Sequence, residues 1–107
     1  MKWANLVYYP GLTVSDTGLV KRKAWSVYKG KERIEIDESY PKVNKDKSGD
    51  TYIDYYAEGR LKKLFICDLV WNGFYPDNRV NRNTWITHID GNKRDNSLKN
   101  LKKLNRR

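Results

Sequence analysis

The sequence is short and strongly basic, and these two properties already limit what the protein can be. Its 107 residues provide for one domain with a single modest core. With 33% charged and 38% hydrophobic residues, the composition is that of a folded protein rather than a disordered one. The net charge of +9 at pH 7 favours a polyanionic partner, most often nucleic acid, although a soluble surface with surplus lysine is the plainer explanation.

The cysteine content and the lack of long apolar runs exclude further classes. Cys67 is the only cysteine, so no intramolecular disulfide and no cysteine-rich zinc site can form. No run approaches the roughly 18 apolar residues that a membrane-spanning helix needs. The first residues, MKWANLVYYPG, lack the apolar segment of a signal peptide. We therefore expect a cytoplasmic protein with no membrane partner.

Turn residues divide the first 23 residues into short strands. The stretches YPG and SDTG have the composition of turns, and the LTV and LV segments on either side of the second turn fit strands. Gly18 is expected to supply the positive φ of that turn. The cluster Lys21, Arg22 and Lys23 follows directly and is predicted to be exposed.

Two β-hairpins are predicted between residues 24 and 66. In the first, the alternating segments WSVY and RIEI flank a Lys-Gly-Lys turn. The second pairs Thr51–Ala57 with Leu61–Ile66 around Glu58-Gly59. Residues 38–50, between them, are very polar and are predicted to form a loop.

The last 41 residues combine a short helix, a strand and a polar loop. Leu69, Val70 and Phe74 form the apolar face of a helix that Pro76 ends. The segment TWIT is a predicted strand leading into His88, and IDGNKRDN is too polar for regular structure. Beyond it, three leucines spaced by three favour a helix capped by Asn96 or Ser97.

The charge is concentrated in the half of the chain that contains the only histidine. Residues 61–107 carry 11 Lys and Arg against 4 Asp and Glu, whereas residues 1–60 carry 11 against 9. Near pH 7 a neutral imidazole can take a proton from water, so His88 is a candidate general base. Asp90 is a candidate metal ligand or a turn-stabilising acceptor, and asparagines can fix the loop by hydrogen bonds. A lone histidine is, however, more often structural than catalytic.

The order of residues favours the catalytic alternative. HIDGNKRDNSLKNL resembles the HIDGNKxxNxxxNL signature of phage-type HNH endonucleases, a group that includes intron-encoded homing enzymes that nick DNA. Nine positions match, from His88 to Leu101. CDLVWNGFYPD is similar to the HRLVAEAFIPNP segment that precedes this signature, and GLTVSDTGLVKRK is similar to the YEVSNLGRVRS of a modular DNA-binding element. Only residues 24–50 lack a counterpart.

The resemblance implies an α+β fold: a small single domain of β-hairpins with a short helix and a C-terminal ββα-metal motif. It divides residues 1–107 into a strand–turn DNA-binding element (1–23), β-hairpins (24–66) and an HNH-like part (67–107). It makes His88 the general base and Asn100 the residue that holds the loop and orients that base. It also implies one Mg²⁺ or other divalent cation. Finally, it turns Asn100–Leu104 into a strand after one helical turn at Ser97–Lys99, against the helix favoured by leucine spacing.

Three departures from the family pattern concern the metal. Thr87 stands at the position of a ligand that is normally Asp, Asn or His, and a neutral hydroxyl is a poor ligand for Mg²⁺. The last helix, which carries a further ligand, is absent by residue 107, so the motif is expected to be truncated. Cys67 stands where a histidine is usual. Asp90 can compensate only weakly, because it is a single carboxylate on a loop.

Two functions therefore stay open. One is metal-dependent hydrolysis of a DNA phosphodiester bond, a nick, with His88 as base. The other is a catalytically inactive HNH-derived binder of DNA, RNA or a host nucleic-acid-processing protein. A second chain could also supply the missing helix. In each case the expected partner is nucleic acid, foremost double-stranded DNA, with a host or phage protein as the other kind of partner in a bacterial cytoplasm. The candidate nucleic-acid contacts are Lys21, Arg22, Lys23, Lys93, Arg94, Lys99, Lys102, Lys103, Arg106 and Arg107.

Overall fold

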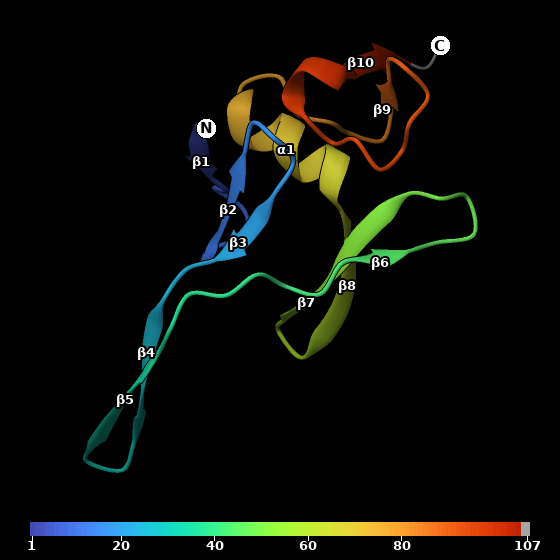
Figure 1. Ribbon diagram of the computed structural model, residues 1–107. Helices are drawn as coiled ribbons and strands as arrows, with labels where there is room; N and C mark the ends of the chain where they lie inside the picture. The colour runs from blue at the N-terminus through green and yellow to red at the C-terminus, as the bar shows by residue number, and fades with distance from the viewer. Residues whose placement is uncertain (106–107) are drawn as a thin grey trace.

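One helix and four small antiparallel sheets make up the fold. The computed structural model describes residues 1–105. In Figure 1 the helix lies between a three-stranded N-terminal sheet and a C-terminal hairpin, and contacts both. This mostly β architecture with one short helix agrees with the expected small α+β domain. Among residues 1–105 no helix has the length and apolar character required to cross a bilayer.

The N-terminal sheet has the order β1-β2-β3, formed by Trp3–Asn5, Leu12–Ser15 and Val20–Arg22. All four residues of β2 are buried, because this central strand has the helix on one side. The predicted turn between the last two strands is confirmed, and Gly18 has a φ of +95° there. The strand β1 was not predicted from the sequence.

A long hairpin, β4 (Trp25–Lys29) with β5 (Glu32–Ile36), projects away from the rest of the molecule (Figure 1). The prediction from WSVY and RIEI is confirmed, with the turn at Gly30 as expected. The projection makes the molecule elongated, with principal extents of 53 × 30 × 29 Å. Nearly all hairpin side chains are exposed, so its register depends on its own turn and cross-strand pairs.

The third sheet has the order β6-β7-β8, formed by Asn44–Lys45, Thr51–Ala57 and Arg60–Phe65. The predicted hairpin of the last two strands is confirmed, although β8 begins one residue earlier than expected. The predicted loop over residues 38–50 is confirmed for most of the segment, but two short pairings interrupt it. Ser39 forms a β-bridge with Arg22, and β6 pairs with the start of β7. These pairings give hydrogen-bond partners to backbone groups that lie beside existing strands.

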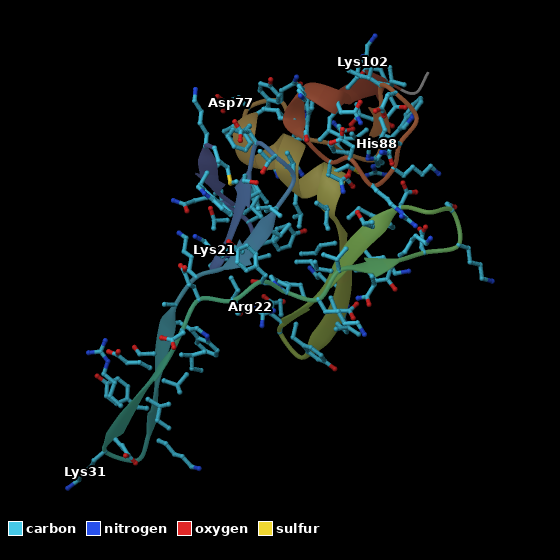
Figure 2. All side chains as sticks on the ribbon, viewed as in Figure 1. Lys21, Arg22, Lys31, Asp77, His88 and Lys102 are labelled. Carbon is cyan, nitrogen blue, oxygen red and sulfur yellow. The ribbon has the colours of Figure 1, made fainter. Side chains whose placement is uncertain are left out.

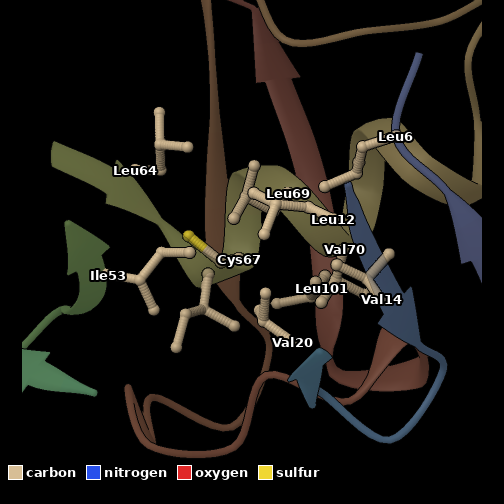
Figure 3. Close-up of a cluster of buried hydrophobic side chains, with 11 residues drawn as sticks. Leu6, Leu12, Val14, Val20, Ile53, Leu64, Cys67, Leu69, Val70 and Leu101 are labelled. Carbon is tan, nitrogen blue, oxygen red and sulfur yellow. The ribbon is translucent and has the colours of Figure 1, made fainter. Parts of the chain in front are cut away.

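The helix α1 (Ile66–Phe74) carries the centre of the core. It buries Ile66, Leu69 and Val70 on one face, at the spacing of three and four residues that the sequence suggested. Ile66 was expected to end the preceding strand, but its side chain belongs to this helical face. Figure 3 shows the helix residues meeting the side chains of Leu12 and Val14 from the N-terminal sheet. The core also reaches Leu101 of the C-terminal hairpin.

The C-terminal hairpin pairs β9 (Thr84–His88) with β10 (Leu101–Asn105), separated by a loop and the 3-10 turn η1 (Leu98–Asn100). A helix beginning at Asn96 or Ser97 is therefore wrong, and the strand implied by the family resemblance is confirmed. Local leucine spacing is overridden because pairing with β9 satisfies the backbone while Leu101 still enters the core.

Candidate functional site

His88 occupies the last position of β9, directly before the polar loop. It lies opposite Leu101 in the strand register, and its imidazole is half-buried. The backbone beyond it is fixed at once: the Ile89 amide donates to the Asn100 carbonyl at 2.8 Å, and the Gly91 amide donates to the His88 carbonyl at 3.0 Å. The strand end therefore holds the imidazole on an ordered backbone, although it stands beside an irregular segment.

The side chain that contacts the imidazole is Asn96. Its Oδ1 lies 2.8 Å from His88 Nε2, and its Nδ2 donates to Thr51 Oγ1, also at 2.8 Å. In the structure the amide oxygen faces the ring, and because an amide oxygen only accepts, His88 Nε2–H is the donor of this hydrogen bond. Neutral His88 then carries its proton on Nε2. Nδ1 has no hydrogen-bond partner within residues 1–105 and keeps its lone pair for a proton from outside.

Asn100 holds the loop, as the resemblance implied, but its side chain does not contact the base. Its Nδ2 donates to Asp90 Oδ1 at 3.0 Å and to the Asp95 carbonyl at 2.9 Å, while its Oδ1 accepts from the Asp90 amide at 3.1 Å. Asn100 is buried, so these bonds take the place of the hydrogen bonds that its amide group would make with water. The side chain in contact with the imidazole is that of Asn96, whereas Asn100 binds the loop residues that follow His88.

The turn between β2 and β3 braces the same segment from the N-terminal side. The carbonyl of Asp16 accepts from the Leu98 amide at 2.8 Å, and Ser97 Oγ donates to the Thr17 carbonyl at 3.4 Å. A Cβ placed on Gly18 would lie 2.8 Å from the carbonyl carbon of Asn96. The turn between β2 and β3 therefore packs against the backbone of the residue that contacts His88.

The described residues do not fit a divalent-metal site. Asp90 Oδ1 already accepts from Asn100 and, at 2.8 Å, from the Asn92 amide, so this carboxylate stabilises the loop. Thr87 offers only a neutral hydroxyl. No group of three or more His, Cys, Asp or Glu side chains able to hold a metal ion occurs in the part of the chain that the structure describes.

Cys67 does not replace the histidine that is usual at its position. Burial, and next the charge of Asp68, raise the pKa of the thiol to about 12, so it stays protonated at neutral pH. A protonated thiol is a poor nucleophile, and unlike the imidazole of histidine it cannot accept a proton at neutral pH. The thiol donates to Asp68 Oδ1 at 3.7 Å, while burial raises the pKa of that carboxyl above its ordinary value.

The predicted basic contacts fall into two groups. Some are used within the fold: Lys21 pairs with Glu38 at 3.5 Å and covers the Trp3 ring, and Lys93 Nζ donates to the Ser48 carbonyl at 2.7 Å. Lys103 contacts Asn78 Oδ1. The exposed ones without an ion pair among residues 1–105 are Arg22, Lys23, Arg94, Lys99 and Lys102. Arg106 and Arg107 lie outside the described residues.

The site has an exposed basic margin on the C-terminal hairpin. Figure 2 shows His88 and Lys102 at the same end of the molecule.

Hydrogen bonds from Ser97 lower the pKa of Asp95, and the charges of Lys99 and His88 add to this effect. Two further exposed cations, Arg79 and Arg82, lie in the loop before β9, and Arg79 covers the Tyr8 ring. Only the basic composition of residues 61–107 indicated them.

Comparison with known proteins gives one informative match. A solved structure titled "DNA binding and cleavage by the HNH homing endonuclease I-HmuI" superposes with a TM-score of 0.69 at 25% sequence identity. The match covers 98% of this chain and 53% of that one, so the chain spans about half the length of the protein it matches. No family model matches the sequence, and no curated protein matches it. The chain therefore shares an HNH-endonuclease-like fold over nearly its whole length.

The tautomer of His88 gives a direct test of the Asn96 contact. We expect neutral His88 to be the Nε2–H form, with a slowly exchanging ring proton, because Asn96 Oδ1 accepts it. Nitrogen-15 NMR reads this without ambiguity, since the chain has one histidine. Asn96→Ala should give mixed tautomers and a rapidly exchanging proton, and Thr51→Val should weaken the preference. Asn92→Ala, in the same loop but not in contact with the ring, should leave the spectrum unchanged; a single Nδ1–H form in the wild type would contradict the assignment.

Proposed function

We propose that this chain binds double-stranded DNA and carries the general base of an HNH-type phosphodiester hydrolysis, the nicking of one strand. His88 is that base. The observation that carries the proposal is the 2.8 Å contact of His88 Nε2 with Asn96 Oδ1: a ring that donates to Asn96 through Nε2 has Nδ1 available to accept a proton from water. The similarity to a structure described as DNA binding and cleavage by an HNH homing endonuclease supports this choice of reaction.

The residues of the chain account for the proton transfer as follows. Water approaching the exposed side of the imidazole gives its proton to Nδ1, and the resulting imidazolium keeps its Nε2–H bond to Asn96 Oδ1. That bond becomes charge-assisted and therefore stronger as the proton moves. Thr51 Oγ1 accepts from Asn96 Nδ2 and so holds the amide group beside the ring. Asn96 and Thr51 are positioning residues in this reaction.

DNA binding is assigned to the exposed cations near His88. Arg94, Lys99 and Lys102 lie on the loop and hairpin that hold the base, and none has an ion pair within residues 1–105 to compete with a phosphate. Contacts of this kind are independent of sequence and weaken steeply with salt. They position the backbone of the DNA and carry no information on the bases.

The side chains at the expected metal position are poor ligands, and this favours a second candidate function. Mg²⁺ or another divalent cation is what the family resemblance implies, yet Thr87 is neutral and Asp90 is engaged by the loop. No step through a metal ion follows from these residues. The alternative is a catalytically inactive binder of DNA, RNA or a host nucleic-acid-processing protein that keeps the fold and the basic surface.

A plasmid-nicking assay in Mg²⁺ or Mn²⁺ separates the two functions. We expect the wild type to convert supercoiled plasmid to open circles and His88→Ala to lower the rate by about 100-fold or more, as for the loss of a general base. Duplex binding in EDTA should be equal for both proteins, with a log–log salt slope of about −4 to −5 for roughly five phosphate contacts. Duplex binding without any nicking would support the inactive binder. A duplex affinity that does not change with salt concentration would contradict binding through the exposed cations.

A further inference from the structure

A groove lies where the long hairpin leaves the N-terminal sheet, away from His88. Its volume is about 550 Å³, and apolar surface predominates in its lining. Three aromatic side chains from two sheets line it, Trp25 from β4 and Tyr55 and Tyr56 from β7, together with the cations Arg22 and Lys23. Figure 2 shows Arg22 at this junction. The volume is within the range of small-ligand sites.

One of the aromatic rings is open to solvent and another is fixed. Trp25 is 52% exposed, so it presents ring surface that nothing in the described chain fully covers. Tyr56 follows Tyr55 in the extended strand β7, so its side chain points to the opposite face of that strand. Tyr55 is half-buried, its hydroxyl donates to the Pro10 carbonyl at 3.3 Å, and its ring meets Tyr9 edge to face at 5.3 Å. The groove thus has a rigid wall, Tyr55, and one exposed ring, Trp25, available for stacking.

The charge of the groove is positive and uncompensated. None of its lining residues is acidic, and neither Arg22 nor Lys23 has an ion pair among residues 1–105. Their neighbour Lys21 differs, because it is paired with Glu38. The backbone under both cations is held in place: Arg22 exchanges two hydrogen bonds with Ser39, at 2.7 and 3.0 Å, and the Lys23 amide donates to the Gly11 carbonyl at 2.8 Å.

We propose that this groove binds an unpaired nucleotide, with the base stacked on Trp25 and its phosphate held by Arg22 and Lys23. Aromatic rings bind any base through its face, and cations beside them bind the backbone, which is the combination found in proteins that hold single strands. A base inside a duplex presents no free face, so the groove selects unpaired over paired nucleotides. The proposal rests on the nucleic-acid binding proposed above and adds a second site to it.

The test compares single-stranded and duplex affinity of the full-length chain in EDTA. The probes are a short labelled oligonucleotide containing 2-aminopurine, whose fluorescence falls on stacking, and the same strand annealed to its complement. Trp25→Ala is expected to lower single-strand affinity about tenfold, the loss of one base–aromatic stack, and to reduce the quenching. Its duplex affinity should stay at the wild-type value. Trp25→Phe, which keeps a ring, should retain most of the single-strand affinity.

A matched control comes from the same hairpin. Tyr28 is 73% exposed and, three residues from Trp25 in an alternating strand, points to the opposite face, so Tyr28→Ala should change neither affinity. Unchanged single-strand affinity in Trp25→Ala, an equal loss on single strand and duplex, or an equal loss in Tyr28→Ala would each overturn the proposal. Wild-type duplex binding, read in the same titrations, tests the proposed function separately, since that binding does not depend on Trp25.

Discussion

Thr87→Asp is expected to raise the plasmid-nicking rate by at least about tenfold in Mg²⁺. Position 87 is where the family pattern has a metal ligand, and an aspartate would give Mg²⁺ the carboxylate that the hydroxyl of threonine does not. The gain corresponds to about 1.4 kcal/mol of additional transition-state stabilisation, which is modest for a cation placed at a reacting phosphate. Thr87 is half-buried at the strand end, next to His88 and opposite Lys102, where an added carboxylate has a cation nearby.

Two variants control this experiment. Thr87→Val has the shape of threonine and no oxygen, so it should cleave no faster than the wild type. The double variant with Thr87→Asp and His88→Ala should lose the gain, because the added ligand needs the base. If Thr87→Asp folds and binds DNA yet nicks no faster than the wild type, the metal position assigned from the resemblance is wrong for this chain.

Gly18→Ala is expected to lower the free energy of unfolding by about 2–4 kcal/mol. Part of this loss is backbone strain, since a side chain at a φ of +95° costs about 1–2 kcal/mol. The rest comes from the contact of the new Cβ, which would lie 2.8 Å from the carbonyl carbon of Asn96 and 3.0 Å from its oxygen. Thermal or urea unfolding followed by circular dichroism measures the change.

Gly11→Ala is the matched control for this substitution. Gly11 has a similar φ of +90°, but a Cβ there meets nothing within 4 Å, so only the strain should appear. The difference between the two variants isolates the contact with Asn96. Gly18→Ala should also disturb the His88 tautomer and slow nicking, because Asn96 orients the ring. Equal destabilisation in the two variants would show that this turn does not brace the site.

The sequence by itself determined the local elements of this protein. Turn glycines between alternating segments predicted the hairpins β4–β5 and β7–β8, because register in a hairpin is set by neighbouring residues. The spacing of Leu69 and Val70 predicted the apolar face of α1. The ordered motif around His88 predicted a strand, a polar loop and a returning strand, which the structure contains.

Only the tertiary structure decided how the site is assembled. The bond from Asn96 to Thr51 joins residues 45 positions apart, and Gly18 meets Asn96 from another sheet. No local pattern encodes such approaches, so the sequence did not indicate that Asn96 contacts the imidazole, and it treated Lys21 as an exposed surface cation. Leucine spacing similarly favoured a helix after Ser97, where pairing with β9 formed a strand instead. Short-range propensities describe each segment alone, whereas burial and distant hydrogen bonds choose among the conformations that those propensities allow.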